Sequence, residues 1–169
     1  MKWLLLLAGV SVALCAVSRA PAKRDFLVDE HEDGGFLLSV VGPSGSELLG
    51  HIGRKVPHDD LHGDVSFDLS SVYDEPSGGY KLTISWDGPA DKIFEDCFDF
   101  GDKQWYGGPE QKEQYWPIQN GHLSKYSIIS KEDDNAAVSE RYWLNSAGQY
   151  IYIQPEAPLF VDHHKVLNN

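Results

Sequence analysis

The chain has 169 residues, enough for one domain with a sizeable core but not for two. With 41% hydrophobic and 12% aromatic residues, its composition is typical of a globular protein rather than a disordered one. The formal charge of −12, from 14 Lys+Arg against 26 Asp+Glu, argues against nucleic-acid binding, because a phosphate backbone requires a basic surface.

The N-terminal residues 1–20 predict a secretory signal peptide. Lys2 precedes an apolar run from Trp3 to Val17, and small residues follow at Ser18 and Ala20. The run is shorter than the roughly 20 apolar residues that a membrane helix needs. We therefore expect cleavage after Ser18 and a protein that is secreted or resides in the lumen of the secretory pathway. An uncleaved membrane anchor is the alternative.

Removal of this leader would take Cys15 away and leave Cys97 as the single cysteine. In an oxidising compartment such a residue is either buried as a small hydrophobe or pairs with another chain. Its neighbours Phe94, Phe98 and Phe100 favour burial, so we expect a free, inert thiol.

The remaining chain divides into an acidic linker, residues 21–35, and one domain, residues 36–169. Within the domain, short apolar or alternating runs punctuated by Gly and Pro predict strands, and no stretch keeps a helical period. The expected strands are Phe36–Val41, Ser46–Ile52, Val65–Leu69, Tyr80–Trp86, Ile93–Phe100, Tyr126–Ile129, Glu140–Leu144, Gln149–Ile153 and Leu159–Val161. This pattern predicts an all-β fold, an antiparallel sandwich or barrel.

The most distinctive segment runs from Cys97 to Pro117 and reads CFDFGDKQWYGGPEQKEQYWP. The segment opens as the end of the strand expected over Ile93–Phe100. Its Gly and Pro residues predict breaks at Gly101-Asp102 and again at Gly107-Gly108-Pro109, so the part that carries the rings is expected to be a loop. Flat rings among amide and carboxylate groups on a loop are what a sugar site needs, because rings stack on the apolar faces of a pyranose. The alternative is that the rings pack in the core.

No self-contained catalytic set is evident in the sequence. A glycosidase needs a pair of carboxyl groups, but 26 Asp and Glu residues are too many for any one pair to be singled out from the sequence. The G-x-S-x-G motif of a serine nucleophile is absent. His58 and His62 lie four residues apart, but Pro57 and Gly63 favour a loop in which they form a solvated polar turn. We therefore expect neither a metal nor a cofactor.

Three motifs together resemble the myogenesis-regulating glycosidase branch of glycoside hydrolase family 31. They are CFDFGD, WYGGPEQKEQYWPI and YWLNSAGQYIYIQPEAPLFV, and the resemblance covers about Asp25 to the C-terminus. It implies the galactose mutarotase-like antiparallel β-sandwich that precedes a (β/α)8 barrel in that family. It also implies that the two catalytic aspartates of a retaining exo-α-glycosidase lie in the barrel. The chain stops before that barrel, so we expect a truncated chain without catalytic residues.

The resemblance further implies a loop that reaches over the mouth of the barrel and helps to close the pocket for the terminal sugar of an α-glycoside. The matching positions are Trp105 to Glu110 and Gln114 to Trp116. The expected substrate-binding residues are Trp105, Tyr106, Glu110, Gln114, Tyr115 and Trp116. Two other interpretations remain open. One is a free-standing secreted carbohydrate-binding or regulatory module, and the other is a structural or interaction protein whose rings only pack.

The tryptophans separate these interpretations. Trp86 and Trp143 lie on alternating strands and are expected to be core residues. Trp105 and Trp116 lie on the expected loop, so we expect their replacement by alanine to leave folding almost unchanged.

Overall fold

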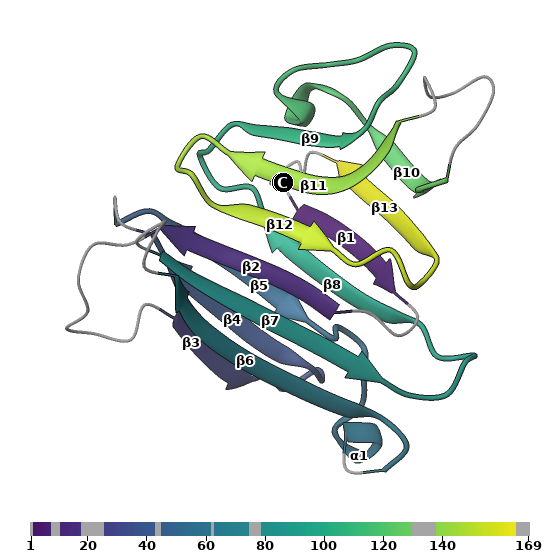
Figure 1. The fold of residues 1–169 in the computed structure, drawn as a ribbon. Coiled ribbons are helices and arrows are strands. Elements are labelled where there is room, and N and C mark those ends of the chain that lie inside the picture. The colour runs from purple at the N-terminus through teal and green to yellow at the C-terminus, as the bar shows by residue number, and fades with distance from the viewer. Residues whose placement is uncertain are drawn as a thin grey trace.

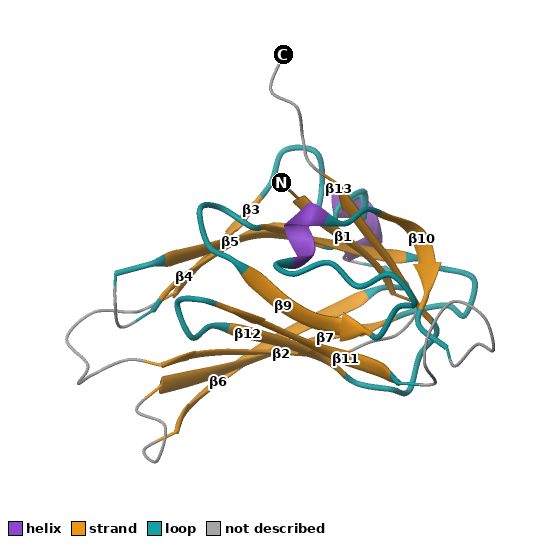
Figure 2. Cartoon of the chain, turned by 90° about the horizontal axis from the view of Figure 1, so that it is seen from above, coloured by secondary structure: helices purple, strands orange, loops and turns teal. Residues whose placement is uncertain are grey.

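The computed structural model describes residues 2–7, 11–17, 26–42, 45–61, 63–74, 79–129 and 138–164. Two antiparallel β-sheets lie face to face in these ranges, and Figure 2 shows them as two layers. The expected all-β sandwich is therefore confirmed.

The first layer is a seven-stranded sheet with the order β10-β13-β1-β8-β5-β4-β3 (Figure 1). Its strands in that order are Leu123–Ser127, Leu159–His164, Lys2–Leu7, Phe94–Asp99, Glu47–Ile52, Phe36–Val41 and Phe26–Glu30.

The second layer is a six-stranded sheet with the order β6-β7-β2-β12-β11-β9. Its strands in that order are Ser66–Asp74, Gly79–Asp87, Ser11–Val17, Tyr150–Ile153, Ser139–Asn145 and Trp105–Pro109. The short α-helix α1 (His58–Leu61) and the 3-10 turn η1 (Ile118–Asn120) lie in connections between strands.

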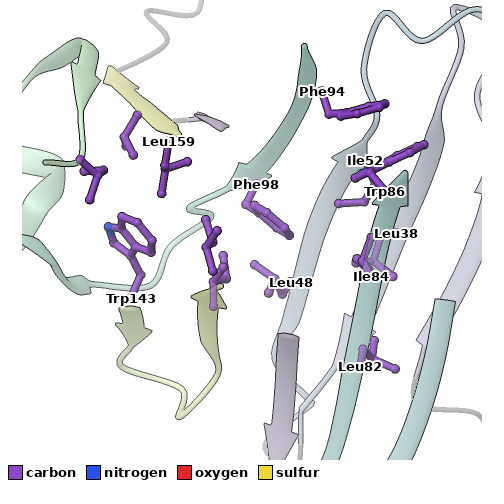
Figure 3. Packing of buried hydrophobic residues seen from close by; sticks show 14 of the residues in the cluster. Leu38, Leu48, Ile52, Leu82, Ile84, Trp86, Phe94, Phe98, Trp143 and Leu159 are labelled. Atoms are coloured by element: carbon purple, nitrogen blue, oxygen red, sulfur yellow. The ribbon is translucent and has the colours of Figure 1, made fainter. Parts of the chain in front are cut away.

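The core fills the space between the two layers, as Figure 3 shows for part of it. Strand β7 alternates as its sequence predicts, so that Leu82, Ile84 and Trp86 are buried between exposed or half-buried neighbours. The ring of Trp86 stacks on Phe94 of the opposite sheet with centroids 5.1 Å apart. Trp143 is also buried, so both tryptophans predicted to be core residues are confirmed.

Two predicted hairpins are confirmed. Strands β4 and β5 pair in register from Phe36↔Ile52 to Val41↔Glu47. In the second hairpin, β11 pairs with β12, and the N–H of Asn145 donates to the carbonyl of Gln149 at 2.8 Å.

Three expectations about local structure are wrong. Residues 26–30 are not linker but strand β3, because Phe26 and Val28 pack against the core while pairing with β4. Residues 58–61 form the helix α1 rather than a loop. Pairing continues through Gly107 to Pro109, because β9 is an edge strand and the proline needs no ladder donor on its open side.

Part of the predicted signal peptide lies within the sheets. Lys2–Leu7 forms β1 between β8 and β13, and Ser11–Val17 forms β2 between β7 and β12. Residues 18–25, which contain the expected cleavage position, lie outside the described residues. In the part of the chain that is described, no helix is long and apolar enough to cross a membrane.

Candidate functional site

Three exposed aromatic side chains, Tyr106, Tyr115 and Trp116, lie on β9, the edge strand of the six-stranded sheet, and on the segment that follows it. The side chains of Tyr106 and Trp116 are 37% and 51% exposed, and their ring centroids lie 5.8 Å apart at an interplanar angle of 32°. The hydroxyl of Tyr106 donates to Oε1 of Gln104 at 2.9 Å, which helps to orient the ring. Two adjacent, partly exposed rings form a surface on which a flat apolar face can stack.

The glycine pair inside the aromatic motif allows β9 to lie close to β11. Gly107 has φ +102°, and a Cβ atom added there would lie 2.2 Å from the carbonyl oxygen of Tyr142. A Cβ atom on Gly108, at φ +83°, would lie 2.7 Å from Nε1 of Trp143. Because no side chain fits at either position, these glycines permit close strand pairing rather than ending it.

Trp105 does not belong to the exposed surface, which corrects its predicted role in the sugar-binding loop. It is fully buried, and its ring packs 5.7 Å from that of Phe100. Its indole Nε1 donates to the carbonyl of Phe100 at 3.2 Å, and its backbone N–H donates to Oε1 of Gln119 at 3.0 Å. A side chain in this position cannot stack on a sugar in this structure, and Trp105 is a core residue.

The polar residues of the predicted site differ in their exposure and in the hydrogen bonds that they make within the loop. Glu110 is exposed, and its backbone N–H donates to the carbonyl of Val138 at 3.0 Å, beyond the last strand pair. Gln114 is half-buried, and its Oε1 accepts the backbone N–H of Gln111 at 3.0 Å, which shapes the segment between the rings. Tyr115 is 51% exposed. The structure thus brings Tyr106 and Trp116 together, with Tyr115 beside Trp116 in the chain.

Sequence reasoning missed Gln104 and Gln119. Gln119 joins the two ends of the loop, since its Oε1 accepts from Trp105 and its Nε2 donates to the carbonyl of Lys103. Isolated glutamines between aromatic residues carry no positional signal in a single sequence, so their role appears only in the fold.

The hollow beneath the loop is too small for a sugar. It is lined by Gly107, Pro109, Gln114, Tyr115, Ile118 and Trp143, among others, and its volume is about 10 Å³. Such a space holds about one water molecule. A sugar stacked on the ring pair would therefore lie outside this hollow.

Two ionisable groups whose pKa values are strongly raised, Asp96 and Cys97, lie elsewhere, on β8. Asp96 is fully buried, and burial raises its pKa to about 7. Its neighbour Glu95 is paired with Arg54 and Lys55 at 3.5 and 3.0 Å. Burial also raises the pKa of the Cys97 thiol, to about 11. Asp96 and Cys97 are buried, and the Trp86 indole lies beside the Asp96 carboxyl, so neither group belongs to the exposed rings.

The seven-stranded sheet has an open groove of about 500 Å³ on its own surface. Leu37, Leu49, His51, Arg54 and Lys55 contribute to its lining. Its two basic side chains are already paired with Glu95. Among the residues that the structure describes, no three His, Cys, Asp or Glu side chains are grouped so that they could hold a metal ion.

Comparison with known proteins gives one partial relationship. No family model matches the chain, and no solved structure matches it. A SITS-binding protein from Tetronarce californica is 39% identical over 72 residues, which are 40% of this chain and 10% of that protein. The chain thus matches about a tenth of the length of this relative.

Proposed function

We propose that this chain is the N-terminal domain of a secreted or lumenal α-glycosidase of the family 31 type, in which it caps the carbohydrate site. The catalytic aspartates belong to a (β/α)8 barrel outside this chain. The observation that carries the proposal is the exposed pair Tyr106 and Trp116 on an edge strand and the loop after it. An edge position suits a capping role because no described strand pairs with the outer side of β9, although Gln119 already accepts the backbone N–H of Trp105.

The chemistry of the ring pair fits a sugar. A ring that covers about 60 Å² of the apolar face of a pyranose contributes about 1.5 kcal/mol, or about tenfold in affinity. One such contact discriminates between ligands without holding them tightly. This is the behaviour expected of a cap that completes a pocket built mainly by another domain.

Two further observations support a domain of a larger enzyme. The loop carries two exposed carboxylates, Glu110 and Glu113, and the buried carboxyl of Asp96 lies on β8, so the described residues beside the rings include no buried acid of the kind a glycosidase uses. The partial relative is about ten times longer than its matched segment, as a multidomain protein would be.

The test is a titration of methyl α-glycosides against the chain alone and against the chain joined to a family 31 barrel, with Tyr106→Ala in both forms. Tyr73→Ala is the matched control. Tyr73 is equally exposed at 37%, also lies beside a second ring (Tyr80, 5.1 Å), and sits on the opposite edge of the same sheet.

We expect the joined protein to lose about tenfold in affinity with Tyr106→Ala and nothing with Tyr73→Ala. Equal losses from both variants would refute the assignment of the rings. Full affinity of the chain alone would favour a free-standing carbohydrate-binding module. Aryl α-glycoside hydrolysis by the chain alone would overturn the assignment of catalysis to the barrel.

A further inference from the structure

A second pair of aromatic rings lies on the six-stranded sheet, on the strands next to β9. Tyr142 of β11 and Tyr150 of β12 have ring centroids 5.3 Å apart at an interplanar angle of 33°. Tyr142 is 37% exposed, and Tyr150 is half-buried. Tyr152 of β12 lies directly opposite Tyr142, so a third tyrosine shares this side of the sheet.

The strand register connects this pair to Tyr106. Leu144 of β11 lies opposite Tyr106 of β9 on one side and opposite Tyr150 of β12 on the other. Leu144 is as exposed as Tyr106, whereas Trp143 and Asn145, its neighbours in the chain, are buried. Residues directly opposite each other in a sheet point to the same face, which here is the outer one.

The strands β9, β11 and β12, which lie side by side in Figure 1, thus share one outer surface. Its apolar and aromatic side chains are here called the aromatic face, and they are Tyr106, Trp116, Tyr142, Leu144, Tyr150 and Tyr152.

The outer surface of β6 and β7, in the other half of the same sheet, is different. Its cross-strand pairs are polar, since Ser70 lies opposite Thr83 and Asp68 lies opposite Ser85. The outward side of a sheet that faces water is ordinarily polar in this way. A contiguous aromatic surface on one half of the sheet therefore indicates a binding surface.

We propose that the aromatic face binds a linear, uncharged oligosaccharide, one end of which stacks on Tyr106 and Trp116. The inference rests on the proposed carbohydrate role of that ring pair and extends it from one sugar to a chain. Adjacent strands lie about 4.8 Å apart, so the backbones of Tyr106 and Tyr150 are separated by roughly 10 Å across the sheet. A single pyranose cannot stack on rings at both positions, but successive units of a chain can.

The composition of the aromatic face favours a sugar chain over a second protein surface. Leu144 is its one aliphatic residue, and the others are rings. The tyrosines also carry hydroxyl groups, which can donate to and accept from sugar hydroxyls. The cores of protein interfaces are enriched in Met and Arg as well as in aromatic residues, and the aromatic face contains neither.

The charges beside the aromatic face favour an uncharged chain. Glu110 follows directly after β9, and Glu140 is exposed two residues before Tyr142 on the same face of β11. Arg141 alternates to the other face, where its Nη1 donates to backbone carbonyls at 3.0 and 2.7 Å. The two carboxylates would repel an acidic polysaccharide but can accept hydrogen bonds from neutral sugar hydroxyls.

The experiment is an NMR titration of the full chain with neutral α-linked glucans of increasing length, from maltose to maltohexaose. We expect the affinity to rise about tenfold once the glucan reaches the second ring pair, because a further stacked sugar covers about 60 Å² of apolar surface. The amide resonances of Tyr142, Leu144 and Tyr152 should shift with maltohexaose. Those of Ser70 and Thr83, on the polar half of the sheet, should not.

Two substitutions at Tyr142 test the contact itself. Tyr142→Ala should remove the gain with length and leave the response of the Tyr106 amide to maltose unchanged. Tyr142→Phe keeps the ring and should keep the gain. Tyr73→Ala is the matched control, since Tyr73 is equally exposed and lies beside a second ring on the other half of the sheet. If Tyr142→Ala does not fold, the length dependence and the amide shifts of the wild type decide.

The failure of this inference is distinguishable from failure of the capping role. An affinity independent of length, or equal binding by Tyr142→Ala and the wild type, would overturn the inference, and a loss with Tyr106→Ala would still support capping. Tyr106→Ala without effect on methyl α-glucoside or on any glucan would refute capping itself. Protection of the Tyr142 and Leu144 amides in the chain joined to a family 31 barrel, without a response to maltohexaose, would also overturn the inference, because another domain would then cover the face.

Discussion

The backbone N–H of Gly53 donates a hydrogen bond of 2.6 Å to Oδ1 of Asp96, which joins the turn after β5 to the middle of β8. Burial, with a smaller contribution from the charge of Glu95, raises the pKa of Asp96 from 3.8 to about 7. The Gly53 hydrogen bond and the Trp86 indole act in the opposite direction. Asp96 is therefore a carboxyl group that stays protonated in the folded protein well above its ordinary pKa.

Stability should consequently fall as the pH rises. In the unfolded chain Asp96 ionises near its ordinary pKa of 3.8, whereas in the folded chain it keeps its proton until about pH 7. Between these values the folded state binds more protons, so its advantage is full below about pH 4 and is lost as the pH rises through 7. At about 1.4 kcal/mol per pKa unit, the loss approaches about 4 kcal/mol.

The measurement is denaturant unfolding of the wild type and Asp96→Asn from pH 4 to 8. Asn cannot ionise but retains an oxygen for the Gly53 N–H, so the difference between the two proteins isolates this proton. We expect the wild type to lose stability relative to the variant across this range. A constant difference would show that Asp96 titrates alike in both states.

Trp105→Ala should lower the stability of the domain much more than Trp116→Ala does. Trp105 is fully buried and its indole is hydrogen-bonded to Phe100, so truncation creates a cavity and should cost about 3–5 kcal/mol. Trp116 is half-exposed and loses mainly its contact with Tyr106, worth about 0.5–1.5 kcal/mol. Thermal unfolding of both variants checks this, and equal shifts of the midpoint would contradict the different burial of the two rings.

The tryptophans show which parts of the fold can be predicted from sequence patterns and which cannot. Alternation placed Trp86 and Trp143 correctly, because every second residue of a strand faces the same side. Trp105 was misassigned because Gly101-Asp102 and Gly107-Gly108 framed it like a loop. The glycines in fact allow β9 to approach β11, and close approach between distant strands leaves no local signal.

The candidate site, like the fold, could be predicted only in part from the sequence. The motif identified Tyr106 and Trp116 as exposed rings, and the structure brings them within 5.8 Å. It could not show that Gln119 connects the ends of the loop, since this depends on a turn fourteen residues after Trp105. The strand at Phe26–Glu30 is not evident in the sequence because Asp29 and Glu30 end it and two further acidic residues, Glu32 and Asp33, follow within three positions, so the segment resembles an acidic linker.

Cys97 should react slowly with thiol reagents in the native protein. Its side chain is buried, and burial raises the pKa of the thiol to about 11, although Nη1 of Arg54 at 3.9 Å opposes this. Little thiolate is therefore present at pH 8. Labelling with a maleimide before and after unfolding checks this, and we expect a large acceleration in denaturant. Fast labelling of the native form would contradict burial, and a disulfide-linked dimer would show that the thiol is accessible.

The last prediction concerns the stability that is lost when a side chain is added at Gly107. Gly107→Ala places a methyl group 2.2 Å from the carbonyl oxygen of Tyr142, a backbone atom of the paired strand that cannot move without breaking the ladder. Gly148 is the matched control. It has a similar positive φ of +82°, but nothing lies within 4 Å of an added Cβ.

Both substitutions force alanine into the left-handed region at a cost of about 1–3 kcal/mol. The additional loss in Gly107→Ala measures the contact between β9 and β11. We expect Gly107→Ala to lower the unfolding midpoint clearly more than Gly148→Ala and to shift the amide resonances of Tyr106 and Trp143. If the two variants were equally stable, β9 would not lie as close to β11 as the structure places it, and the strand that carries Tyr106 would be held less firmly than the proposed capping of a sugar requires.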